Sequence, residues 1–164
     1  MTKVLVASSS RHGATDQIAL AIGEVLSNSG LDVDVLRIAD VDELASYDAY
    51  VLGSAVYMGR WLPDARSFVT QHHELLAARP TWLFSSGPIG DQPAGAEIDT
   101  SEIDALVDPR DHHVFGGRLA VGELSRRERL FARLLHVEDG DYREWHAVTA
   151  WAVAIGRSLV PSSV

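Results

Sequence analysis

The chain has 164 residues, of which 46% are hydrophobic, and a formal net charge of −9 at pH 7. This length suits a single compact domain over residues 1–164, and the acidic balance argues against general binding of nucleic acids. The sequence has no cysteine, which excludes disulfides, iron–sulfur clusters and thiol catalysis.

Apolar runs of strand length alternate with segments of helical periodicity. Residues 3–7 are apolar almost throughout, which is typical of a strand covered on both faces. Residues 31–35 alternate between apolar and acidic side chains, which predicts a half-exposed edge strand. Further strands are predicted at residues 49–53, 80–84 and 113–117, and helices at residues 18–26, 40–46, 62–77, 124–135 and 142–159.

Strands that alternate with helices indicate parallel βαβ units, and therefore a doubly wound α/β sheet. In such sheets, ligands bind beyond the carboxyl ends of the strands, near the point where the strand order reverses. We therefore expect a site built from the loops after the first, third, fourth and fifth strands.

The stretch of residues 8–15, between the first strand and the first helix, is rich in hydroxyls and contains a glycine. Backbone N–H groups and the helix dipole favour an anion at a helix start. Ser9, Ser10 and Thr15 add short hydroxyl donors, and Gly13 lets the backbone turn tightly. This stretch predicts a phosphate site.

The predicted loops of residues 54–61 and 85–90 follow the third and fourth strands and are rich in small residues. Tyr57 and Trp61 lie in the first of them. Small residues together with aromatic faces suit a flat heteroaromatic ring better than a sugar or a metal. For Trp61 two roles remain open, stacking on a ligand or packing the following helix against the sheet.

Several phosphate-binding classes lack their residues here. No G-x-G-x-x-G follows the first strand, and no G-x-x-x-x-G-K-[ST] is present, since Lys3 is the only lysine. A receiver domain needs acidic residues where this chain has Ala7-Ser8 and Gly53-Ser54. A G-x-S-x-G nucleophile elbow is also absent, which argues against a serine hydrolase.

Histidine and tryptophan side chains elsewhere have ordinary explanations. The adjacent pairs His72-His73 and His112-His113 point in diverging directions on a helix or a strand, so we expect no metal site. We expect the remaining indoles to be packing residues, namely Trp82, Trp145 and Trp151.

These loops resemble those of the flavodoxin family, whose phosphate loop is written [ST]-x-T-G-x-[ST]. Ser10, Gly13 and Thr15 match this pattern, and His12 departs from it. Within the superfamily the chain is most similar to the menaquinone-dependent protoporphyrinogen dehydrogenase group. That similarity consists of S-[ST]-R-x-G-x-T at residues 9–15, G-[SA]-x-[VI]-x-x-G at residues 53–59, and G-x-L at residues 117–119 before an arginine-rich helix.

The resemblance implies a five-stranded parallel sheet of order 2-1-3-4-5 with helices on both faces, and non-covalently bound FMN. The implied phosphate residues are Ser9, Ser10, Arg11, His12, Gly13, Ala14 and Thr15. The implied isoalloxazine residues are Ser54, Ala55, Val56, Tyr57, Met58, Gly59, Trp61, Ser86, Gly87, Pro88 and Gly90. No catalytic residue is assigned, and a deazaflavin in place of FMN remains open.

The implied function is that of an FMN-dependent oxidoreductase that oxidises protoporphyrinogen IX with a quinone acceptor. Two alternatives remain open: a flavodoxin-type electron carrier without its own organic substrate, and a binding module that has the fold without the cofactor. A redox partner, either a reductase or a quinone, accompanies the first two.

The helix predicted at residues 124–135 is basic and amphipathic. It carries Arg126, Arg127, Arg129 and Arg133 opposite apolar residues. It is either a docking surface for an anionic membrane or for porphyrin carboxylates, or a covering helix with arginine stems on the core. No signal peptide is evident, and no apolar run reaches the roughly 18 residues of a span, so we expect a cytoplasmic protein. Contact with the inner face of the membrane is the alternative that this helix leaves open.

Overall fold

The computed structural model describes residues 1–11, 13–88, 98–115 and 139–160, without the side chains of residues 87, 88 and 139–144. Its sheet has the strand order β2-β1-β3-β5-β6, with every neighbouring pair on this path parallel. These strands are β1 (Lys3–Ser9), β2 (Asp32–Arg37), β3 (Ala49–Tyr57), β5 (Thr81–Pro88) and β6 (Asp111–Phe115). This arrangement confirms the predicted order and places β2 at an edge.

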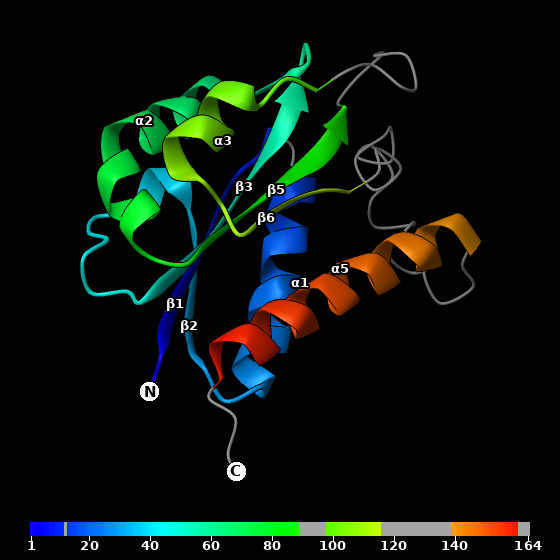
Figure 1. The fold of residues 1–164 in the computed structure, drawn as a ribbon. Helices are drawn as coiled ribbons and strands as arrows, with labels where there is room; N and C mark the ends of the chain where they lie inside the picture. The colour runs from blue at the N-terminus through cyan, green and yellow to red at the C-terminus, as the bar shows by residue number, and fades with distance from the viewer. Residues whose placement is uncertain (12, 89–97, 116–138, 161–164) are drawn as a thin grey trace.

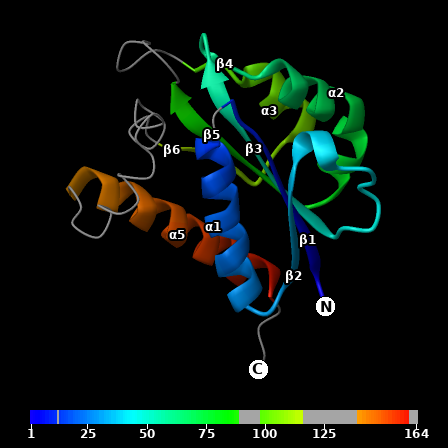
Figure 2. The ribbon, with the colours of Figure 1, turned by 180° about the vertical axis from the view of Figure 1, so that it is seen from behind.

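The helices cover both faces of the sheet (Figures 1 and 2). One face is covered by α1 (Ala14–Asn28) and α5 (Asp139–Leu159), and the other by α2 (Pro63–Ala78) and α3 (Ser101–Val107). Strand β1 explains the two layers. Val4 and Val6 pack towards α1 and α5, whereas Leu5 and Ala7 pack towards α2 and α3, and all four are fully buried.

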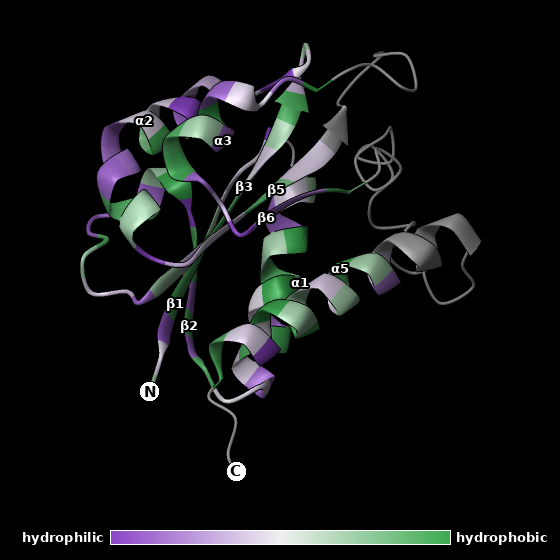
Figure 3. Cartoon of the chain, viewed as in Figure 1, coloured by the Kyte–Doolittle hydropathy of each residue, from purple (hydrophilic) through white to green (hydrophobic). Residues whose placement is uncertain are grey.

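Apolar residues on the inner faces of the helices form the two cores, as the hydropathy colours in Figure 3 show. Trp82 and Trp151 are buried in the core beneath α1 and α5, and Trp145 packs against it. This confirms their predicted role as packing residues. Of the histidines, His113 packs against Phe115 in this layer.

The prediction of a helix at residues 40–46 is wrong. A 3-10 turn, η1 (Ile38–Asp40), is followed by irregular chain. Glu43 accepts a hydrogen bond from the Ser46 N–H at 2.8 Å, and Leu44 and Tyr47 are buried. Local bonds from acidic and hydroxyl side chains compete with the helix here, and the two buried residues fix the turn.

Two strands are longer than predicted. The segments 54–57 and 85–88, predicted as loops, continue β3 and β5 in the sheet, with Ser54 paired to Ser85. Their small polar residues suggested loops, but parallel pairing satisfies their backbone groups inside the protein. The structure also adds β4 (Arg60–Trp61), which pairs antiparallel with β3, and α3, which the sequence did not predict.

Candidate functional site

The candidate site lies at the carboxyl ends of β1, β3 and β5, the end of the sheet opposite the N-terminus in Figure 1. Here the loop after β1 meets the hairpin between β3 and β4. Since parallel strands end at the same edge of the sheet, residues distant in sequence converge there, as expected for a doubly wound fold.

The loop after β1 is a preformed turn that leads into α1. Ser10 Oγ accepts a hydrogen bond from the Gly13 N–H at 2.8 Å, and Gly13 has a φ of 93°. The first helical hydrogen bond runs from the Gln17 N–H to the Gly13 carbonyl, and no side chain within the described ranges caps the helix start. The N–H groups of Ala14 and Thr15 therefore have no partner within the helix and can hold an anion.

The O–H of Ser10 can still donate a hydrogen bond. The Ser10 oxygen accepts from Gly13, and its O–H has no hydrogen-bond partner among the described residues, so this O–H can donate to an anion. Arg11 is exposed beside it, and Thr15 is buried at 1% exposure.

Two carboxylates anchor the end of β1. The Ser8 hydroxyl donates to Asp16 Oδ1 at 2.7 Å, and the Ser9 hydroxyl donates to Asp64 Oδ1 at 2.6 Å. These bonds tie β1 to the first turns of α1 and α2, on opposite faces of the sheet. The Ser9 hydroxyl is therefore occupied by Asp64, and a phosphate would rely on Ser10 and the helix N–H groups.

The β3–β4 hairpin presents an aromatic ring beside this turn. Its two tip residues are Met58, with a φ of 55°, and Gly59, with a φ of 78°, as in a type I′ turn. Tyr57 and Met58 are 44% and 67% exposed. The Arg11 guanidinium lies 4.4 Å from the centre of the Tyr57 ring, which brings the turn of residues 10–13 and the hairpin together.

The other predicted isoalloxazine residues on β3 and β5 lie inside the sheet. Ser54, Ala55 and Val56 are buried, and the Ser54 hydroxyl accepts from the Leu62 N–H at 3.0 Å. The pairing of β3 with β5 shifts register after Ala55, which leaves Gly87 as an extra residue before Pro88. Such bulges recur beside binding sites.

Ser86, on β5 and opposite Ala55, is fully buried. Its hydroxyl is the one buried side-chain polar atom in the described part of the chain without a hydrogen-bond partner. A buried hydroxyl of this kind needs an explanation, and a bound ligand would supply one.

Trp61 is 1% exposed and lies in the core beneath α2 and α3. Its Nε1–H donates to Ser85 Oγ at 2.8 Å, and its ring meets the His112 ring edge-on at 5.9 Å. Of its two predicted roles, this environment favours packing.

The sequence did not reveal a hydrogen-bonded chain below the hairpin. Ser85 Oγ lies 2.8 Å from His112 Nε2, and His112 Nδ1 lies 2.7 Å from Asp104 Oδ1. The sequence analysis considered His112 only in a pair that could bind a metal, and it expected no metal site there. No local motif joins these three residues, because β5, α3 and β6 bring them together only in the fold.

Parts of the predicted site lie outside the described residues, namely His12, Gly90 and the arginine-rich segment 124–135. Within the ranges that are described, no three histidine or acidic side chains gather as a metal site, and no helix is long and apolar enough to cross a membrane.

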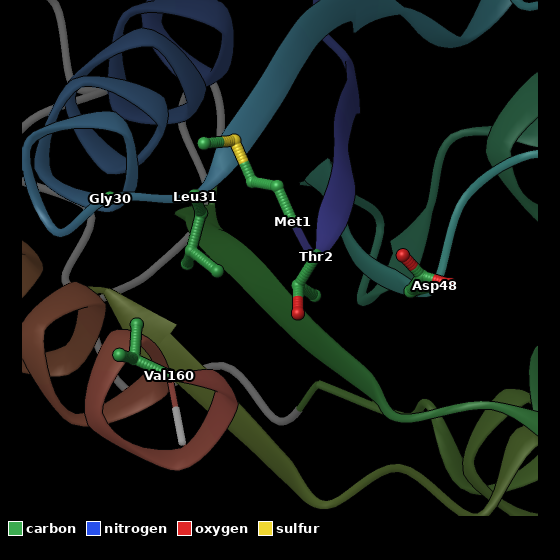
Figure 4. Close-up of a pocket in the computed structure, with 6 residues that line it drawn as sticks. All are labelled: Met1, Thr2, Gly30, Leu31, Asp48 and Val160. Atoms are coloured by element: carbon green, nitrogen blue, oxygen red, sulfur yellow. The ribbon is translucent and has the colours of Figure 1, made fainter. Parts of the chain in front are cut away.

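Two surface hollows are separate from the candidate site. A cavity of about 560 Å³ lies at the opposite end of the sheet, where Figure 4 shows Met1, Leu31 and Val160 around it. A second, of about 380 Å³, lies over α2 and includes Arg66 and Glu102. Neither includes a residue of the turn at residues 10–13 or of the hairpin.

Comparisons with known proteins agree with this fold. A model of the Flavodoxin domain family matches residues 5–145. Over 93 residues the chain is 27% identical to the protoporphyrinogen IX dehydrogenase [quinone] of Escherichia coli strain K12, with 56% of this chain and 51% of that protein covered. It is 31% identical over 93 residues to an NAD(P)H dehydrogenase (quinone) of a Bradyrhizobium species, with 43% and 47% covered.

The chain thus spans about half the length of the curated relatives that it matches. Among solved structures, a flavodoxin from the domain Archaea superposes with a TM-score of 0.63 at 19% identity, covering 96% of this chain and 98% of the flavodoxin. This likeness concerns the fold.

Proposed function

The chain belongs to the Flavodoxin domain family, and from this premise we propose that it is an oxidoreductase that binds FMN without a covalent bond at the carboxyl end of its sheet. The observation that carries the proposal is the uncapped start of α1 next to the Ser10–Gly13 turn. An anion placed there completes the hydrogen bonds of the helix start and meets the positive end of its dipole.

The residues present fit an FMN phosphate. Ser10 offers an O–H, and Ala14 and Thr15 offer backbone N–H groups at the same turn. An added Cβ at Gly13 would have no atom within 4 Å, so the space above the turn is open. Arg11 is close enough to contribute positive charge, while Asp16 and Asp64 are held by the β1 serines.

The flavin ring would lie by the hairpin tip and the end of β5. Tyr57 supplies an exposed aromatic face, and backbone groups of Met58 and Gly59 are at the same edge. The unpartnered Ser86 hydroxyl and the bulge at Gly87 are on the neighbouring strand. In this proposal Trp61 supports the hairpin from below.

Bound FMN would supply the electron transfer, and the protein would bind and orient it and set its potential. The net charge of −9, together with Asp16 and Asp64 beside the phosphate turn, disfavours an extra negative charge on a reduced flavin. This charge would therefore lower the reduction potential of the bound cofactor, to an extent that salt screening limits.

For the substrate, we propose protoporphyrinogen IX, with a quinone as the electron acceptor. The support is the similarity to a relative named for this reaction, and the second relative also carries quinone in its name. A flavodoxin-type electron carrier is the second candidate, because the fold superposes over nearly the full length of a flavodoxin. Membrane contact through residues 124–135 stays a prediction.

Two assays test these proposals in sequence. The purified protein, supplied with FMN, should show the visible absorption of a protein-bound oxidised flavin, and a protein that binds no FMN refutes both redox candidates. The FMN-loaded protein is then given protoporphyrinogen IX and a menaquinone analogue. Porphyrin formation that depends on both protein and quinone supports the dehydrogenase, whereas a flavin that exchanges electrons only with a reductase supports the carrier.

A further inference from the structure

A chain of buried polar contacts crosses the α2 and α3 side of β5 and β6. The Trp61 Nε1–H donates to Ser85 Oγ at 2.8 Å, Ser85 Oγ lies 2.8 Å from His112 Nε2, and His112 Nδ1 lies 2.7 Å from Asp104 Oδ1. Trp61 and Ser85 are buried at 1% and 0% exposure. This row of hydrogen bonds therefore connects the interior beneath the hairpin to the partly exposed Asp104 carboxylate.

The direction of each hydrogen bond follows from the chemistry of its end groups. The Asp104 carboxylate only accepts, so His112 Nδ1 carries a proton and donates it. In the tautomer with a proton on Nδ1 alone, Nε2 accepts a hydrogen bond from the Ser85 hydroxyl. This leaves the lone pairs of Ser85 to receive the indole N–H, so His112 sets Ser85 as the acceptor for Trp61.

A hydroxyl on Nε2 and a carboxylate on Nδ1 have the connectivity of a serine hydrolase triad. Ser85, however, is fully buried, and its oxygen already accepts the indole N–H of Trp61. A substrate carbonyl has no route to it. The row of hydrogen bonds therefore acts through the side chain at its inner end, which is Trp61.

Trp61 is half of β4, and its pairing opposite Val56 holds the hairpin against β3. The same pairing places Tyr57 opposite Arg60, at the rim of the site. A second tie holds the hairpin tip, because the Asp99 N–H donates to the Gly59 carbonyl at 2.7 Å. Both connections to the hairpin, the one from Asp104 and the one from Asp99, begin in α3 or directly before it. In the same region the Thr100 hydroxyl donates to Asp104 at 3.1 Å.

We propose that His112 is a positioning residue for the flavin site: bridging Asp104 and Ser85, it holds Trp61 and with it the hairpin that places Tyr57 beside the phosphate turn. This inference rests on the proposed binding of FMN. Asp104 orients the His112 ring, and Ser85 transmits that orientation to the indole. None of the three touches the cofactor in this account.

The test compares His112→Phe with His113→Phe. Both keep an aromatic ring, but the His113 ring lies on the opposite face of β6, against Phe115 and Trp151. We expect His112→Phe to weaken FMN binding roughly tenfold, because binding must then also position the released hairpin, at a cost comparable to one net hydrogen bond; His113→Phe should leave the affinity within about twofold. The indole N–H resonance of Trp61 in the flavin-free protein should shift only in the first variant.

Rescue distinguishes positioning from general damage. Asp104→Asn keeps an oxygen that accepts the His112 proton and should bind FMN almost as the natural chain does. Asp104→Ala removes that oxygen at a partly exposed position, and like His112→Phe it should weaken FMN binding. The Asp104 pair also keeps the test decisive if His112→Phe fails to fold.

The outcomes separate this inference from the proposed function. If the natural chain binds no FMN, both fall together. The positioning role alone is refuted if the natural chain binds FMN and a folded His112→Phe variant has the same affinity and the same visible circular dichroism of the flavin. If His112→Phe does not fold, Asp104→Ala takes its place in this comparison. Equal losses in Asp104→Asn and Asp104→Ala also refute it.

Discussion

Replacement of Ser10 by alanine separates recognition of the phosphate from recognition of the flavin ring. Ser10 Oγ accepts the Gly13 N–H at 2.8 Å, and its own O–H is free for a phosphate oxygen. A hydrogen bond to a charged group contributes about 1.5–3 kcal/mol, and the lost turn bond adds about 1 kcal/mol. Part of the turn bond is recovered through water, so we expect a net loss of about 2 kcal/mol, or roughly 30-fold in the FMN dissociation constant.

The assay is a titration of the flavin-free natural chain and Ser10→Ala with FMN and with riboflavin, which has the same ring and no phosphate. Ser10→Ala should bind FMN far more weakly and riboflavin nearly as well as the natural chain. Ser46→Ala is the matched control, because this exposed serine lies in the irregular segment before β3. Equal losses for FMN and riboflavin would refute the assignment of the phosphate to this turn.

Two further predictions concern the fold. A Cβ at Gly53 would lie 2.1 Å from the buried Phe84 ring, so Gly53→Ala should lower the free energy of unfolding by about 3 kcal/mol in urea denaturation. Gly30→Ala has open space but a φ of 96° and should cost only about 1 kcal/mol, so equal effects of the two substitutions would contradict the packing argument. Burial, and then the hydrogen bond to Asp34, raise the pKa of Tyr47 from 10.0 to about 12. The stability that the neutral Tyr47 phenol contributes is therefore fully present below pH 10 and is lost as the pH rises towards 12. Tyr47→Phe should flatten this alkaline loss of stability in thermal melts, and an unchanged loss would assign the decline to other groups.

The sequence was sufficient to predict the sheet because the apolar composition of β1 indicates a strand that is buried on both faces. A run such as Val4-Leu5-Val6-Ala7 is stable only when both faces are covered, which requires parallel strands with helices on both sides. The alternation in residues 31–35 likewise predicted the edge position of β2. The turn at Ser10 and Gly13 was predictable because its hydrogen bond and its positive φ depend on adjacent residues.

The parts that the sequence did not predict depend on contacts across the fold. Ser54 and Ser85 looked like loop residues, yet each is buried in a strand with a partner distant in the chain, the Leu62 N–H for one and the Trp61 indole for the other. His112 had no visible role, because Asp104 and Ser85 reach it only once β5, α3 and β6 are assembled. Short-range periodicity carries no information on such contacts.

The central claim is that the start of α1 holds the phosphate of FMN, and the most direct measurement is the ³¹P resonance of FMN added to the flavin-free protein. The account predicts a shifted, broadened signal from bound FMN in the natural chain. At a protein concentration that half-saturates the natural chain, Ser10→Ala should give a signal close to that of free FMN, because its dissociation constant is roughly 30-fold higher. A signal from FMN that stays at its free position in the natural chain, under conditions where binding would be saturated, would contradict the account.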